Sequence, residues 1–150
     1  MARYVTTQPT AWDADTAFGW MADLRHLSDW DPSIESSEQV KGLKPGIGAE
    51  YDVKVKAGGS MRSMRYRIEE MDVEGRTLLA LSHTGVLTSH DRISVESVPN
   101  GGATVTYDAD LVLKGPFKLA DPLLKVGFNR MGDKAAEGLG ATLAASQPPT

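Results

Sequence analysis

The stretch PLLKVGFNRMGDKAAEGLGATLAA, residues 122–145, is the one long helical pattern of the chain, and it follows a series of strand-like segments. Its apolar residues recur at helical spacing. They form one stripe: Leu124, Phe128, Met131, Ala135, Leu139 and Thr142. Asn129, Arg130 and Asp133 are on the opposite face. A helix of this kind has to lie on an apolar surface, which the preceding strands must supply.

Upstream of this helix the hydrophobic period is two. In AEYDVKVKA, residues 49–57, one face carries alanine, tyrosine and valine while the other carries acids and lysines, which is typical of a half-buried antiparallel strand. Glycine and asparagine turn signals, such as Gly58-Gly59, separate the segments. We predict six consecutive strands near 34–42, 49–57, 60–72, 76–83, 86–98 and 103–114.

The N-terminal part combines one strand with two short helices. ARYVTTQ, residues 2–8, is rich in strand-forming residues. Asp13 is placed to cap a first helix, and Asp23 to cap a second helix that ends at Asp31-Pro32, because the residue before proline disfavours the helical conformation. The order is therefore strand, two helices, six strands and one long helix. Such a chain buries its apolar surfaces if the sheet curls around the final helix, and this arrangement favours a ligand cleft.

Composition restricts the class of protein. The 150 residues, 41% hydrophobic and 24% charged, suit one domain, expected at 1–145 with a disordered tail at 146–150. There is no cysteine, so disulfides and thiolate metal sites are excluded. The net charge of −4 with scattered basic residues argues against nucleic-acid binding. No run approaches the roughly 18 to 20 apolar residues of a membrane helix. We expect a cytoplasmic protein without stable membrane insertion and without a cofactor, in an oligomeric state that the sequence leaves open.

Four segments resemble the helix-grip superfamily. They are AFGWMADLRHLSDWDPSI, GLKPGIGAEYDV, HDRISVESVPNGGATVTYDADLVLKGP and ADPLLKVGFNRMGDKAAEGL. This superfamily (SRPBCC, START-like or Bet v 1-like) includes the birch-pollen allergen, START lipid-transfer domains and polyketide cyclases. Within it the chain is most similar to small bacterial polyketide cyclase/dehydrase and lipid transport proteins. The resemblance implies an α+β helix-grip fold, in which a seven-stranded curved antiparallel sheet wraps around a long C-terminal helix. It implies no catalytic motif, since members share a cavity and differ in function.

In this fold the apolar phase of each strand faces the helix. The candidate ligand-binding residues are Trp30, Tyr51, Val53, Met64, Tyr66, Tyr107, Leu124, Phe128 and Met131. The tryptophan lies where the second helix passes into the next strand, so that it either packs structurally under the helix pair or contacts the ligand. Gly127 and Gly138 border the helical stripe and indicate either close packing or cavity space.

One polar residue interrupts the apolar phase of LTSHDRISVE, residues 87–96. Asp91 shares its face with Leu87, Ile93 and Val95, and a carboxyl group in such surroundings should have a raised pKa. Tyr107 on the next strand is a candidate donor to it. The two residues are tentative catalytic residues for acid-base chemistry on a carbonyl-containing ligand. Alternatively, Asp91 caps the hairpin or pairs with Arg62, Arg65 or Arg67 near the cavity mouth.

Three functions remain open from the sequence. The first is binding of a small hydrophobic or aromatic ligand, such as a lipid, a polyketide-like compound or an isoprenoid. The second is a polyketide aromatase/cyclase or dehydratase that uses the cavity acid-base residues. The third is an adaptor for a protein partner. A metal site is not expected, because His26, His83 and His90 show no metal-binding spacing.

Overall fold

The computed structural model describes residues 2–57 and 59–149. Gly58, part of the predicted hairpin turn, and Thr150, at the end of the predicted tail, lie outside the described residues. Among the described helices, none is long and apolar enough to cross a membrane.

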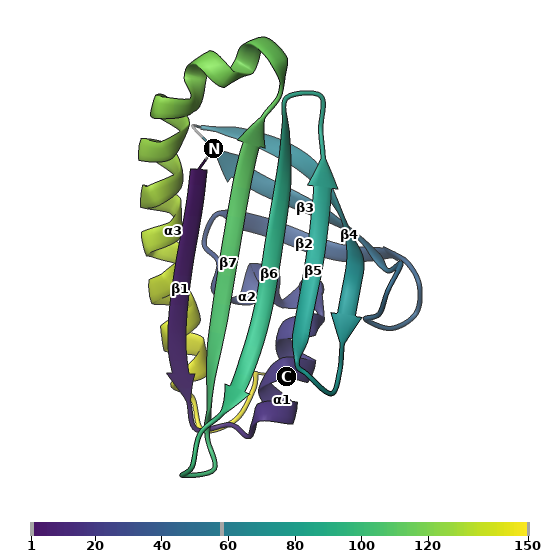
Figure 1. Cartoon of the computed structure of the whole chain (residues 1–150), viewed down its shortest axis with the longest axis vertical. Helices are drawn as coiled ribbons and strands as arrows, with labels where there is room; N and C mark the ends of the chain where they lie inside the picture. The colour runs from purple at the N-terminus through teal and green to yellow at the C-terminus, as the bar shows by residue number, and fades with distance from the viewer. Residues whose placement is uncertain (1, 58, 150) are drawn as a thin grey trace.

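Seven strands form one antiparallel sheet in the order β1-β7-β6-β5-β4-β3-β2. The strands are β1 (Ala2–Thr10), β2 (Ile34–Lys41), β3 (Glu50–Ala57), β4 (Ser60–Asp72), β5 (Thr77–His83), β6 (Leu87–Ser97) and β7 (Ala103–Leu113). Register shifts interrupt the β2–β3 pairing twice and the β4–β5 pairing once, and such irregularities bend a sheet. In Figure 1, β2 and β3 consequently run behind the other strands. The predicted α+β helix-grip fold, a curved sheet around a long C-terminal helix, is confirmed.

The helical elements are α1 (Ala14–Ala22), the 3-10 helices η1 (Leu24–His26) and η2 (Gly115–Ala120), and the α-helices α2 (Leu27–Trp30) and α3 (Asp121–Leu143). The single helix predicted after Asp23 is divided into η1 and α2. The segment begins with a tight turn of 3-10 type. The Asp23 carboxylate accepts a hydrogen bond from the Arg25 N–H at 3.1 Å, and the Leu27 N–H bonds to the Leu24 carbonyl three residues back. Asp13 caps α1 as predicted, accepting from the Thr16 N–H at 2.9 Å.

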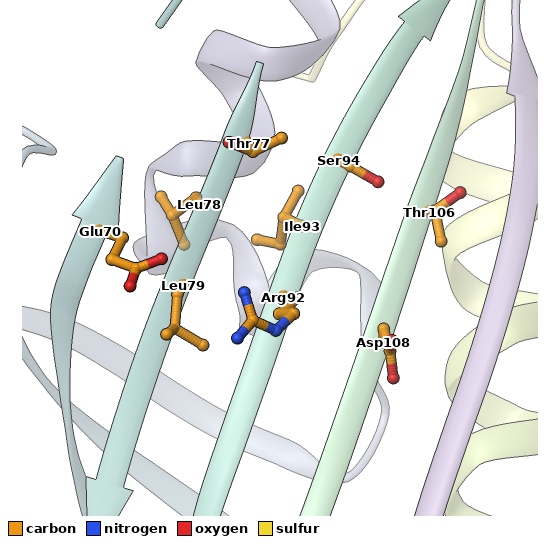
Figure 2. A pocket seen from close by; sticks show the side chains of 9 residues that line it. All are labelled: Glu70, Thr77, Leu78, Leu79, Arg92, Ile93, Ser94, Thr106 and Asp108. Carbon is orange, nitrogen blue, oxygen red and sulfur yellow. The ribbon is translucent and has the colours of Figure 1, made fainter. Parts of the chain in front are cut away.

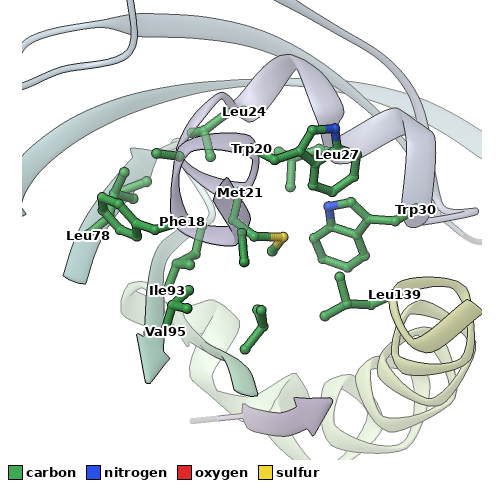
Figure 3. Close-up of a cluster of buried hydrophobic side chains, with 14 of the residues drawn as sticks. Phe18, Trp20, Met21, Leu24, Leu27, Trp30, Leu78, Ile93, Val95 and Leu139 are labelled. Atoms are coloured by element: carbon green, nitrogen blue, oxygen red, sulfur yellow. The ribbon is translucent and has the colours of Figure 1, made fainter. Parts of the chain in front are cut away.

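The core fills the end of the fold that α1 and α2 cover. Figure 3 shows side chains of the helix pair meeting those of β6 and α3, including Met21, Trp30, Ile93 and Leu139. Each of these four is at most 5% exposed. Burial of this many large apolar side chains is the main source of stability of such a domain.

The C-terminal half of α3 is held to β1, to the segment before α1 and to α2. The Thr10 hydroxyl donates to the Leu143 carbonyl at 2.9 Å, and the Trp12 indole donates to the Ala145 carbonyl at 2.8 Å. These bonds satisfy carbonyl groups that a helix end leaves unpaired. At Gly138 the helix approaches so closely that an added Cβ would overlap the Trp30 carbonyl oxygen. Around Gly127, by contrast, an added Cβ would meet nothing within 4 Å.

Candidate functional site

The inner face of the sheet changes along the strands. Near the helix pair its residues are sealed: Tyr51, Val53 and Val105 are 0% exposed. Farther along the same strands, Val55 and Tyr107 are half-buried. The sheet therefore has a packed end under α1 and α2 and an open end beyond it.

The apolar stripe of α3 shows the same change. Leu139 and Leu143 in its C-terminal half are 0% exposed, whereas Leu124, Phe128 and Met131 in its N-terminal half are half-buried. The helix packs mainly on β1 and α2, so its first turns do not cover the central strands closely. We use the name open surface for six of the half-buried inward side chains at this end of β3, β4, β7 and α3. They are Val55, Met64, Tyr107, Leu124, Phe128 and Met131.

A chain of hydrogen bonds adjoins the open surface. Tyr66 Oη donates to Ser89 Oγ at 3.1 Å, and Ser89 Oγ donates to Asp91 Oδ1 at 2.6 Å. Tyr107 Oη donates to the other carboxyl oxygen, Asp91 Oδ2. The Trp30 and Tyr107 rings pack in a T-shaped arrangement, with 5.1 Å between their centroids. Three strands, β4, β6 and β7, thus hold four polar side chains in one connected network.

Burial dominates the electrostatics of this network. It raises the pKa of Asp91 to about 6, against the lowering effect of the Ser89 and Tyr107 hydrogen bonds. Burial also raises the pKa of Tyr66 and of Tyr107 well above that of an ordinary tyrosine. Asp31, whose own pKa burial raises, adds repulsion that makes ionisation of Asp91 harder. Asp91 is therefore the member of this network whose protonation changes nearest to neutral pH.

The sequence model of a family described as "Polyketide cyclase / dehydrase and lipid transport" matches residues 1–144. The chain belongs to this family. No curated protein shows significant sequence similarity to this member of the polyketide cyclase / dehydrase and lipid transport family.

Solved structures show the same fold at low sequence identity. The Zhui aromatase/cyclase from Streptomyces sp. R1128 superposes with a TM-score of 0.76 at 14% identity, over 93% of this chain and 91% of that one. A START superfamily protein from Mycobacterium smegmatis has a TM-score of 0.76 at 14% identity, over 95% and 97%. A major latex-like protein from Panax ginseng has a TM-score of 0.65 at 14% identity, over 96% and 98%. At these identities the likeness establishes the fold and not the ligand.

The candidate ligand-binding residues fall into two groups by how deeply their side chains are buried. Met64, Tyr107 and the three residues of α3, namely Leu124, Phe128 and Met131, lie on the open surface. The others lie deeper: Tyr51 and Val53 are 0% exposed, Trp30 is 5% and Tyr66 is 7%. The structure therefore places Tyr51 and Val53 in the packed core, because the helix pair covers that end of the sheet. The Trp30 ring packs against the Tyr107 ring.

Two of the three arginines expected as alternative partners of Asp91 pair with other residues. Arg65 pairs with Glu50 at 3.7 Å and Arg67 with Glu69 at 3.8 Å. Asp91 instead bonds to Ser89 and Tyr107. The role of Ser89 was not predicted from the sequence, although its position two residues before Asp91 puts it on the same face of β6.

One further hydroxyl group lies beside the network. Ser82 on β5 is in register with Tyr66 on one side and Ser89 on the other. It is 1% exposed, and within residues 2–57 and 59–149 its Oγ has no hydrogen-bond partner. Its neighbours in the sheet could not be known before the strand order was known.

The histidines take no part in this network's hydrogen bonds. His26 stacks on Trp20 with centroids 4.4 Å apart and bonds to Asp29 at 2.8 Å. His83 is exposed and contacts Thr88 at 3.3 Å. In the described part of the chain, no group of three or more metal-binding side chains comes together.

Two hollows lie away from the open surface. One, of about 180 Å³, is on the outer face of the sheet, where Figure 2 shows Glu70, Arg92 and Asp108 around it. The other, of about 480 Å³, lies between α1 and the β4–β5 turn and includes Met71 and Arg76. Neither hollow contains a member of the hydrogen-bond network.

Proposed function

We propose that the open surface binds a small hydrophobic or aromatic ligand, such as a lipid, a polyketide-like compound or an isoprenoid. The observation that carries this proposal is the change in burial along the inner side of the fold, from 0% exposed residues under the helix pair to half-buried ones farther along β3, β7 and α3. A domain that needed only a core would gain stability by sealing this face. The family description, which names both polyketide cyclases and lipid transport, supports the same class of ligand.

The side chains of the open surface suit such a ligand. Met64 and Met131 are flexible and polarisable, so they adapt to different apolar shapes. Phe128 and Tyr107 offer aromatic faces for stacking. The Asp91 network gives one polar point at the edge of the apolar surface, which would orient a ligand that carries oxygen.

A second candidate function is catalysis, and the Asp91–Tyr107 hydrogen bond favours it. A carboxyl group with a pKa of about 6 can give a proton to a ligand and take one back near neutral pH. In a cyclase or dehydratase, Asp91 and Tyr107 would then be the acid-base residues. Asp91→Asn and Tyr107→Phe would both abolish turnover of an identified substrate, whereas unchanged turnover would leave binding alone.

The adaptor alternative predicts exposed apolar side chains. Phe117, Leu119, Leu123 and Val126 on η2 and α3 are 47% to 90% exposed. Leu123 and Val126 are on the same turns of α3 as Leu124 and Phe128, and Phe117 and Leu119 precede them on η2. These exposed side chains adjoin the open surface in the chain, so we assign them to the ligand-binding proposal and leave a protein partner to the test below.

A matched pair of tryptophan substitutions tests the ligand proposal. Met131→Trp adds bulk on the open surface, whereas Leu123→Trp adds it at a position that is 79% exposed on the same helix. Native mass spectrometry of protein from its own host should show a retained hydrophobic molecule in the wild type and in Leu123→Trp. In Met131→Trp the Kd for this molecule should rise by about tenfold, which corresponds to roughly 1.4 kcal/mol of lost affinity, and the retained fraction should fall accordingly.

Circular dichroism serves as the folding control for both variants.

If the wild type carries no ligand and takes up none from a lipid and polyketide panel, the proposal is wrong, and affinity capture of a protein partner becomes the next experiment.

A further inference from the structure

The hydrogen bonds of the network can be assigned proton by proton. An ionised carboxylate accepts only, so Ser89 and Tyr107 must both donate to Asp91. Because the Ser89 proton is used in this way, Tyr66 must donate to Ser89. The three hydroxyl protons are then all consumed inside the network. While Asp91 is ionised, a ligand meets oxygen lone pairs here and no free O–H group.

Protonation of Asp91 adds a fourth proton to the same three bonds. If Asp91 Oδ2 carries that proton, Asp91 donates a hydrogen bond to Tyr107 Oη. The Tyr107 O–H group stays protonated and becomes free to donate a hydrogen bond elsewhere. Tyr107 is the half-buried member of the network, whereas Tyr66, Ser89 and Asp91 are at most 7% exposed. The freed O–H group therefore belongs to the least buried residue of the network, which is itself part of the open surface, and a ligand there could accept its hydrogen bond.

We infer that Tyr107 donates a hydrogen bond to a carbonyl oxygen of the ligand, and that it does so only when Asp91 holds a proton. This inference rests on the proposed function and adds the chemical class of the ligand: an apolar or aromatic compound with a ketone or similar carbonyl group. A ligand hydroxyl group is complementary to the ionised network, because it can donate to the carboxylate.

Several groups act on Asp91 besides Tyr107. Asp31, which precedes β2, disfavours its ionisation, and His90 on β6 favours it. Tyr66 on β4 and Tyr107 on β7 stay protonated between pH 5 and pH 8, because burial raises the pKa of each above the ordinary tyrosine value. The Asp31 carboxylate is held by the Ser33 N–H at 2.9 Å and the Ser33 hydroxyl at 2.7 Å. Asp91 is thus the group whose protonation changes the number of donors in the network.

Ser82 does not remove this dependence. Its hydroxyl lies on β5 between Tyr66 and Ser89, on the side of the network away from Tyr107 in the strand order. It is 1% exposed, so it does not offer its proton at the open surface. When Asp91 Oδ2 carries the proton, Tyr66 still donates to Ser89, so Ser82 takes no part in freeing the Tyr107 O–H group.

Three probes of one shape test the inference. They are 2-acetylnaphthalene, 1-(2-naphthyl)ethanol and 2-ethylnaphthalene, which differ only in the oxygen group. Isothermal titration calorimetry at pH 5 and pH 8 should show tighter binding of the ketone at pH 5 by about three- to tenfold, the range that one hydrogen bond contributes. The hydrocarbon should bind equally at both pH values. The alcohol should show the opposite trend to the ketone or none.

Two variants separate the donor from the switch. Tyr107→Phe should bind the ketone no better than the hydrocarbon at either pH, because the donor is gone. Asp91→Asn should bind the ketone independently of pH, because an amide cannot lose the added proton. By linkage, the ketone should also raise the pKa of the Asp91 carboxyl in a carbon NMR titration.

The outcomes distinguish the two proposals. If the hydrocarbon binds but the ketone binds equally at pH 5 and pH 8 in the wild type, the inference is overturned while ligand binding stands. If no probe binds the wild type, the proposed function fails and the inference fails with it.

Discussion

Gly138→Ala should destabilise the protein although alanine is the better helix former. An added Cβ at this position would overlap the backbone carbonyl oxygen of Trp30, so α3 would have to move away from α2. Overpacking of this kind costs roughly 1 to 3 kcal/mol or more, which exceeds the helix-propensity gain of about 1 kcal/mol. We expect a net loss of about 2 kcal/mol, or a decrease of about 4 to 8 °C in Tm for a domain of this size.

The same substitution at Gly127 provides the control. This residue is exposed, on the same helix, and an added Cβ would meet nothing within 4 Å. Gly127→Ala should therefore raise the free energy of unfolding by about 0.5 to 1 kcal/mol. Thermal denaturation of both variants measures the difference. Equal effects would mean that α3 does not approach α2 as closely as the structure shows.

Asp91→Asn should change how stability depends on pH. Burial raises the pKa of Asp91 in the folded protein to about 6, from an ordinary value of 3.8. Because the folded state binds this proton more tightly than the unfolded state does, the wild type loses stability as the pH rises from about 4 to about 6. A shift of about two pKa units corresponds to roughly 2 to 3 kcal/mol. The variant lacks this loss, so its stability relative to the wild type should increase over the same range.

Urea denaturation at a series of pH values from 4 to 8 measures this effect. Tyr107→Phe is a useful companion, since the Tyr107 hydrogen bond lowers the pKa of Asp91 and its removal should extend the decline of stability to higher pH. Other carboxylates, among them Asp23 and Asp108, have lowered pKa values and contribute the opposite slope at acidic pH, but they are common to all three proteins. Parallel curves for the wild type and Asp91→Asn would show that Asp91 is not held in an environment that disfavours its charge.

Much of this architecture can be predicted from residue patterns. Period-two alternation in β3, β6 and β7 identifies their inner faces, and the stripe of α3 identifies the face of that helix. Asp91 stands out because it is charged and in phase with Ile93 and Val95. Such a local pattern suffices to select Asp91 and Tyr107 as neighbours once β6 and β7 are paired.

Other features depend on contacts between distant segments. The spacing of apolar residues in α3 does not reveal where along the helix the core ends. Leu139 and Met131 are both members of the apolar stripe, yet Leu139 is buried and Met131 is half-buried. The caps that Thr10 and Trp12 provide for α3 join residues that are more than 130 positions apart. In the same way, the alternation in β3 does not distinguish Tyr51 and Val53 from the residues of the open surface.

The methionines offer the most direct test of the central claim, that the ligand occupies the open surface. Met64 and Met131 belong to that surface, Met21 lies in the packed core, and Met71 borders the hollow beside α1. With [methyl-¹³C]methionine, an NMR titration with 2-ethylnaphthalene should shift the methyl signals of Met64 and Met131 and leave that of Met71 in place. A shift of Met71 alone, or of none of these signals, would contradict the claim.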